Sequence, residues 1–123
     1  MRLKANLVLP WPPSANRYWR NVRGRTLVST EARVYKQTIK KMMLVWGNSS
    51  AYPFKERLEI EIYAYPPDKR KRDLDNLLKV TMDSLQSAGF YLDDGQVDKI
   101  TITRQSVVPN GELHILLSEI EHE

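Results

Sequence analysis

Residues 57–65, RLEIEIYAY, alternate between apolar and polar side chains, which predicts a β-strand with one buried face. The apolar residues on that face are Leu58, Ile60 and Ile62. Residues 74–88 follow a helical period instead, with apolar side chains three and four positions apart, and Gly89 is placed to end that helix. Because each of these elements has one apolar face to bury, the pair predicts a helix packed against a sheet.

Further elements can be placed on both sides of this pair. Strands are predicted at residues 4–9, 96–108 and 112–118, and the sequence PNG is expected to form a hairpin connection between the last two. Ser29 or Thr30 can cap a helix whose apolar positions recur at helical spacing until Gly47 ends it. The intervening segment NRYWRNVRGR is predicted to form a loop or ribbon. We therefore expect one small α+β (α/β mixed) domain over residues 1–123, with a mixed β-sheet, two main helices and a C-terminal β-hairpin.

Charge and composition narrow the class of partner. The 123 residues carry a formal net charge of +4, and because three acids lie in the last five residues, residues 1–118 carry +7. This excess favours a polyanion such as nucleic acid, although a moderate positive charge is also common in proteins that merely stay soluble. Without cysteine the chain cannot form disulfides or thiolate metal sites. With no signal-type start and no membrane-length apolar run, we expect an intracellular, soluble protein.

The segment DKRKRDLDNLLK sets cations against carboxylates at the start of the helix predicted for residues 74–88. Asp73 is expected at the N-cap, Asp75 in the first turn, and Lys79 one turn beyond Asp75 on the polar side. Two carboxylates can bind Mg²⁺, with water and a substrate phosphate completing its shell. Preceding cations that would attract a phosphodiester backbone are Lys69, Arg70, Lys71 and Arg72. The alternative is a capped helix, an ordinary surface ion pair and a solvated basic loop.

A second carboxylate pair occurs in the segment YLDDGQVD. Asp93 and Asp94 precede Gly95, and this composition is typical of a turn. The other interpretation is that one of the two aspartates completes a metal shell. The general base is not a histidine, because His122 lies in the acidic tail and His114 is expected on the polar face of a strand. A bound metal would instead lower the pKa of a water molecule and neutralise charge at phosphorus.

The segment LPWPPSANRYWRNVRGRT near the N-terminus combines arginines with aromatic side chains. Trp11, Tyr18 and Trp19 could stack on exposed or distorted bases, although each aromatic by itself is more often a core residue. The arginines that would contact phosphates are Arg17, Arg20, Arg23 and Arg25. Together these residues indicate a DNA-binding loop.

Over nearly its full length the chain resembles the RusA family of Holliday junction resolvases. The resemblance rests on LPWPPSANRYWR, GRTLVS, DKRKRDLDNLLK and GFYLDDGQV, in that order. It implies a small homodimeric endonuclease, cytoplasmic and encoded by a bacterium or phage, that cuts four-way DNA junctions by paired, symmetric incisions in recombination and repair. It also implies Mg²⁺ as cofactor, with Mn²⁺ able to substitute. By similarity the catalytic carboxylates and metal ligands are Asp73, Asp75 and Asp94, and the essential lysine is Lys79.

Two other functions stay open on the sequence. A non-catalytic branched-DNA-binding module, whose carboxylates only cap helices and turns, would bind junctions without regard to Mg²⁺. A metal-dependent nuclease for another branched nucleic acid would differ only in its preferred substrate. Cleavage of a four-way junction beside a linear duplex separates these possibilities.

Overall fold

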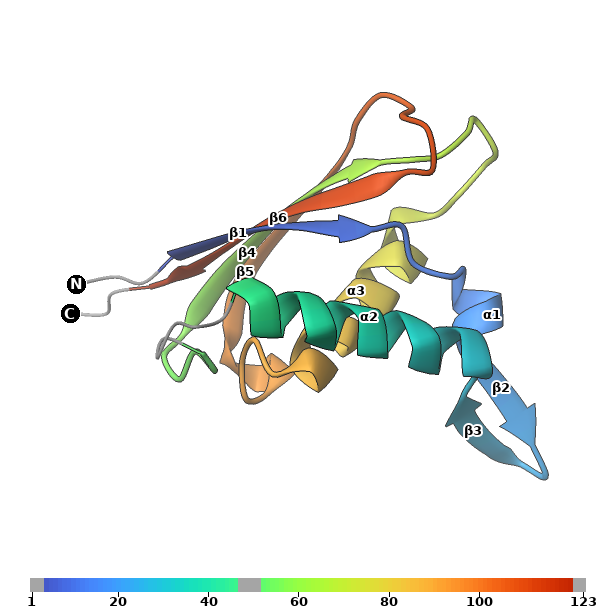
Figure 1. The fold of residues 1–123 in the computed structure, drawn as a ribbon, viewed down its shortest axis with the longest axis horizontal. Coiled ribbons are helices and arrows are strands. Elements are labelled where there is room, and N and C mark those ends of the chain that lie inside the picture. The colour runs from blue at the N-terminus through green and yellow to red at the C-terminus, as the bar shows by residue number, and fades with distance from the viewer. Residues whose placement is uncertain (1–3, 47–51, 121–123) are drawn as a thin grey trace.

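The computed structural model describes residues 4–46 and 52–120, and its main sheet has four strands (Figure 1). They are β1 (Lys4–Pro10), β4 (Leu58–Tyr65), β5 (Val97–Arg104) and β6 (Glu112–Glu119). Their order is β1-β6-β4-β5, in which β6 runs antiparallel to both neighbours and β4 runs parallel to β5. The predicted α+β class with a mixed sheet is therefore confirmed.

Two helices, α2 (Thr30–Trp46) and α3 (Leu74–Ala88), cover one face of this sheet (Figure 1). The alternation in β4 places its predicted apolar residues in the core, where each is at most 1% exposed. Residues of β1, β6 and both helices pack against them in the same core, among them Leu7, Leu9, Leu113, Ile115, Leu117, Ile39 and Leu85. The core therefore lies between the sheet and the two helices, and holds α3 in a fixed position. Among the described residues, no helix is long and apolar enough to cross a membrane.

The ends of both helices follow local rules that the sequence contains. Ser29 Oγ accepts a hydrogen bond from the Ala32 amide at 3.1 Å, so Ser29 rather than Thr30 caps α2. Gly89 closes α3 with a φ of 95°, a left-handed conformation that favours glycine, and its amide donates to the Gln86 carbonyl at 3.1 Å. Gly47, predicted to end the other helix, lies outside the described residues.

The predicted C-terminal β-hairpin is wrong, because β4 lies between β5 and β6. Helix α3 is the crossover that returns the chain to the same sheet, which makes β5 a parallel neighbour of β4. The strand predicted over residues 96–108 ends at Arg104, and the next residues carry the chain past the end of β4. There the Gln105 amide donates to the Ala64 carbonyl at 2.8 Å. The mostly exposed β5 takes the edge, while β6, with every second side chain buried, takes a central position.

The arginine-rich segment forms a short helix, α1 (Ala15–Tyr18), and a separate hairpin of β2 (Trp19–Val22) and β3 (Arg25–Val28). Arg23 and Gly24 make its two-residue turn with φ values of 52° and 77°, as the right-handed twist of paired strands requires. The hairpin projects from the body of the molecule (Figure 1). The predicted ribbon is confirmed for residues 19–25, whereas residues 16–18 belong to α1.

Candidate functional site

Two carboxylates, those of Asp73 and Asp75, lie at the start of α3. Asp73 is the N-cap residue, as predicted, but its side chain makes no capping hydrogen bond. Asp75 lies exposed in the first turn. Within residues 4–46 and 52–120, neither carboxylate has a side-chain hydrogen bond or ion pair. Their role is therefore not that of ordinary capping groups, and both are available to a ligand near the positive end of the helix.

A cavity of about 490 Å³ on the flank of α3 is lined by residues of α3 and by residues of the chain that follows it. Lys79 and Asp94 both line it, as does Asp83, which the sequence interpretation missed. Asp83 lies four residues after Lys79 and eight after Asp75, so helical spacing alone could have placed all three on one face. The Asp83 carboxylate is 2.8 Å from Lys36 Nζ and accepts a 2.5 Å hydrogen bond from the Tyr18 hydroxyl.

That network changes the interpretation of one predicted stacking residue. The Tyr18 side chain is fully buried, and its hydroxyl also lies 3.0 Å from Ser84 Oγ. Burial first, and then the hydrogen bond to Asp83, raise the pKa of Tyr18, which keeps the hydroxyl protonated as a donor. Tyr18 therefore fastens α1 and the arginine hairpin to α3 and is not a platform for a base. Trp11 and Trp19 are partly exposed.

Asp94 is positioned by Tyr91, a residue that carried no predicted role. The hydroxyl of Tyr91 lies 2.7 Å from Asp94 Oδ1 and 3.0 Å from the Met82 carbonyl oxygen, with one proton to share between them. Burial, followed by the hydrogen bond to Asp94, raises the pKa of Tyr91, so the donor proton is retained. The Asp94 amide also donates to Gln86 Oε1 at 3.2 Å. The carboxylate is thus tied to the middle of α3, beside Lys79.

Gln96 gives the same loop its rigid shape. Its Oε1 accepts from the Leu92 and Asp93 amides at 2.8 and 2.9 Å, and its Nε2 donates to the Phe54 and Glu56 carbonyls, each at 2.9 Å. Asp93 is the N-cap of the short 3-10 helix η1 (Asp94–Gln96), which agrees with the turn interpretation for this residue. Of the two neighbouring aspartates, Asp94 is the one that lines the cavity with Lys79.

The basic loop before α3 contains one structural arginine and three outward cations. Arg72 Nη1 is 2.8 Å from Asp68 Oδ1, it donates to the carbonyls of Asp68 and Arg70, and its guanidinium lies 5.6 Å from the centre of the Trp11 ring. Only 23% of its side chain is exposed, whereas Arg70, although paired with Asp68, is 81% exposed. Lys69 and Lys71 are also exposed. Arg72 is therefore chiefly a brace, and the other three present charge to solvent.

The brace depends on an ionised carboxylate. The Arg72 and then the Arg70 guanidinium hold the pKa of Asp68 below its ordinary range. A carboxyl group whose folded-state pKa is lowered stabilises the fold above its unfolded pKa and loses that contribution only as the pH falls through the folded value. The loop is therefore braced at neutral pH and loosens only in acid.

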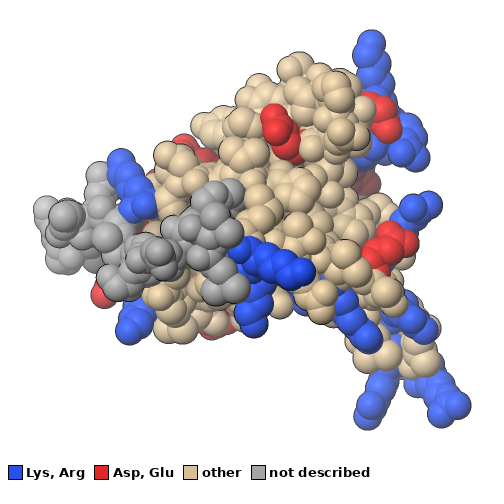
Figure 2. Space-filling model, in the orientation of Figure 1, with Lys and Arg blue, Asp and Glu red and all other residues tan. Residues whose placement is uncertain are grey.

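The predicted phosphate-binding arginines occupy two neighbouring places. Arg20, Arg23 and Arg25 are exposed on the projecting hairpin, and Figure 2 shows Lys and Arg side chains gathered over it. Arg17 lines a hollow together with Arg70 and Lys71, about fifty residues away in the sequence. The fold thus brings Arg17 of the N-terminal segment beside the basic loop, while the other three arginines lie on the hairpin.

The match to a protein-family model decides what kind of chain carries this geometry. Residues 10–115 match the model described as Endodeoxyribonuclease RusA, and this range contains every candidate residue described above. The chain belongs to the RusA family. It is 43% identical over 122 residues to the crossover junction endodeoxyribonuclease RusA of Escherichia coli (strain K12), covering 96% of this chain and 97% of the relative. The protein of the same name from Enterobacteria phage 82 is 38% identical over 118 residues, with the same coverage.

The predicted metal ligands of this RusA-family site lie on separate parts of the chain. Carboxylate oxygens are the donors that Mg²⁺ prefers, so the chemistry of Asp73, Asp75 and Asp94 suits the ion. However, in the part of the chain that the structure describes, no three acidic or histidine side chains form a group that could hold a metal. The reason is their placement, because Asp73 and Asp75 lie at the start of α3, while Asp94 is tied to Met82, about two helical turns further along.

Removal of the Tyr91 hydroxyl tests the positioning of Asp94. In Tyr91→Phe we expect the rate of junction cleavage to fall roughly tenfold with unchanged junction affinity, because the carboxylate loses its buried donor. Loss of one buried hydrogen bond should cost about 1 kcal/mol of unfolding free energy. Single-turnover cleavage, binding anisotropy and thermal melting measure the three quantities. Wild-type cleavage by a variant with the expected loss of stability would show that Tyr91 is purely structural.

Proposed function

We propose that this chain is a Mg²⁺-dependent endonuclease that resolves four-way DNA junctions by paired, symmetric incisions, and that it acts in recombination and repair. The observation that carries the proposal is the shared cavity of Lys79 and Asp94, on the same helix as the uncommitted carboxylates Asp73 and Asp75. The relatives' name, crossover junction endodeoxyribonuclease, supports the choice of a DNA junction as substrate.

The residues divide into a catalytic set and a DNA-binding surface. Asp73, Asp75 and Asp94 are the carboxylates that hold Mg²⁺, which when bound supplies an activated water and neutralises charge at phosphorus. The Lys79 ammonium stabilises the charge that builds on the scissile phosphate. Tyr91 keeps Asp94 in place. The outward cations of the basic loop and of the hairpin hold the flanking phosphates.

The active unit is a homodimer. Paired nicks in a junction are related by a twofold axis, so two identical subunits match the substrate. The separation of Asp94 from Asp73 and Asp75 within the described chain supports a second role for the dimer, in which each metal group combines carboxylates of both subunits. Mg²⁺ binding and catalysis then depend on association of the two copies.

Cleavage of an end-labelled four-way junction, beside a linear duplex of the same sequence, tests the proposal directly. We expect paired symmetric nicks in the junction alone, with Mg²⁺ or Mn²⁺ and not with EDTA. Tight binding that ignores the metal, without incision, would contradict the proposal and favour a binding module. Equal cutting of another branched substrate would instead contradict the assigned substrate.

Replacement of the outward loop cations should change the salt dependence of binding. In Arg70→Ala/Lys71→Ala we expect weaker junction binding and a plot of log K against log salt that is flatter by roughly 2, because each phosphate contact contributes about 0.9. Anisotropy titrations at several salt concentrations measure the slope. The matched control, Lys40→Ala/Lys41→Ala, removes two exposed cations of α2 and should keep the wild-type slope. Equal slopes for both double variants would place the loop outside the DNA interface.

A further inference from the structure

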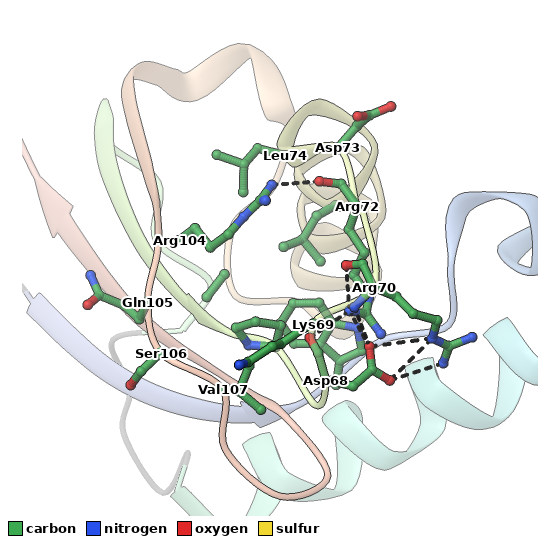
Figure 3. A pocket seen from close by; sticks show the side chains of 14 residues that line it. Asp68, Lys69, Arg70, Arg72, Asp73, Leu74, Arg104, Gln105, Ser106 and Val107 are labelled. Carbon is green, nitrogen blue, oxygen red and sulfur yellow. Dashed lines mark hydrogen bonds and ion pairs between the residues drawn. The ribbon is translucent and has the colours of Figure 1, made fainter.

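A second cavity, of about 450 Å³, lies beside the basic loop and, among the described residues, shares no lining residue with the cavity of Lys79 and Asp94 (Figure 3). Its walls come from segments that are distant in the sequence: Trp11 after β1, the loop before α3 with the first turns of α3, and the chain that leaves β5. The walls are apolar, formed in part by Trp11, Leu74 and Val107. Cations stand around them, namely Lys69, Arg70 and Arg104. Asp73 lies at the edge, with its carboxylate directed away from the ring of cations (Figure 3).

The walls of this cavity are held in place by contacts already made. Arg104 Nη2 donates to the Arg72 carbonyl at 2.6 Å, which joins the end of β5 to the basic loop. Arg72 in turn packs on Trp11 and pairs with Asp68. Because these bonds are formed within the chain, a ligand would enter the cavity without first ordering the loop.

The chemistry of the lining selects the class of ligand. Four cations and two acids line the cavity, and one of the acids, Asp68, is engaged by Arg70 and Arg72. An apolar interior with a cationic rim suits a flat apolar ring that carries a negative group, and the volume lies in the usual range for small-ligand pockets, roughly 300–1,000 Å³. A second copy of the chain is a poorer occupant, because it would bring its own excess of positive charge against the rim.

We propose that this cavity takes one unstacked nucleotide of the junction strand, next to the scissile phosphate, with its base against the apolar walls and its phosphate on Lys69, Arg70 and Arg104. This assignment rests on the proposed function, because only a bound strand places a nucleotide beside Asp73. Bases at a branch point lose part of their stacking, so they leave the duplex more readily than bases inside an uninterrupted helix. The cavity thereby adds selectivity for branched DNA and for the base beside the cut.

An abasic scan combined with a cavity variant tests the assignment. After the cut is mapped with Mg²⁺, junction affinity is measured in EDTA with a tetrahydrofuran abasic residue at each of three positions on either side of it. For the wild type we expect roughly tenfold weaker binding at one position, since the stacking and apolar contacts of the base are lost there. Val107→Glu should weaken binding of the intact junction by a similar factor and show no further loss at that abasic position.

Control variants distinguish an occupied cavity from a folding defect and from a failure of the proposed function. Val107 is 42% exposed in an irregular segment, so the variant should fold, and Val107→Trp, which fills the cavity, provides a second variant with the same expectation. Val34→Glu, at a 58% exposed valine of α2, should keep the wild-type abasic profile.

An abasic scan with no weak position, from an enzyme that still binds and cuts the intact junction, would overturn this inference alone. If the losses of affinity from Val107→Glu and from the abasic residue were additive, the inference would be overturned as well. The same holds if Val107→Glu changed only the self-association of the protein, measured by light scattering, and not junction binding. Failure of the wild type to bind or cut any junction would overturn the proposed function together with it.

Discussion

Asp75→Asn is expected to abolish junction cleavage and to leave junction binding unchanged or tighter. Asn has nearly the same shape as Asp and keeps the first turn of α3, while the charged metal ligand is lost. Stabilisation by a metal amounts to several kcal/mol, so we expect the cleavage rate to fall by roughly a thousandfold or more. Binding is retained because a negative charge facing DNA has been removed. Single-turnover cleavage in Mg²⁺ and anisotropy in EDTA measure the two effects.

The matched control is the same change at Asp93, next to Asp94. Asp93 serves the turn that Gln96 holds, and Asn is also suited to turns, so Asp93→Asn should cut at close to the wild-type rate. Cleavage at the wild-type rate by Asp75→Asn would show that the assigned site is wrong. Equal loss in both variants would mean that the response is to any change of charge near the cavity, and not to a particular ligand.

A mixture of two inactive variants, Asp75→Asn and Asp94→Asn, is expected to regain cutting of one strand per junction. If each metal group takes Asp75 from one subunit and Asp94 from the other, a mixed dimer has one group with both substitutions and one group with neither. The intact group should therefore nick its strand, while paired resolution stays absent. Denaturing gels of a junction labelled on each strand in turn distinguish a single nick from paired nicks. Random exchange of equal amounts makes roughly half of the dimers mixed, so about half of all dimers should gain single-strand cutting.

The control mixture pairs Asp73→Asn with Asp75→Asn. Both positions lie at the start of the same helix, so every group in this mixed dimer lacks one ligand and no cutting is expected. Regained cutting in the control would mean that the two aspartates serve different metal groups. Continued inactivity of the first mixture, with exchange of subunits verified by tagged copies, would show that one chain supplies the whole ligand set.

The elements of this fold were predictable wherever a local rule acts. The alternation of residues 57–65 and the helical period of residues 74–88 place side chains on one face whatever else the chain does, and both elements are confirmed. Caps and turns are equally local, as Ser29, Gly89 and the Arg23–Gly24 turn illustrate. For the same reason the exposed start of α3, with Asp73 and Asp75, could be placed from the sequence alone.

The order of strands could not be predicted in the same way. The sequence PNG, between two strand-like segments, favoured a hairpin. In the structure, however, β5 and β6 lie on opposite sides of β4 and do not pair. The strand order depends on which strand best fills the centre of the sheet and on the crossover connection from β4 through α3 to β5. Both are properties of the whole packed domain. A local turn preference is too weak to decide between them.

The sequence by itself thus determined the elements, the basic segments and the position of Asp73, Asp75 and Lys79 along one helix, because spacing within a helix fixes its faces. Only the tertiary structure decided that Tyr91 ties Asp94 beside Lys79, that Arg72 is a brace on Trp11 while Arg70 faces solvent, and that Arg104 closes a cavity with the basic loop. Each of these contacts joins separate elements that meet only when the core packs, and no periodicity in the chain encodes such a meeting.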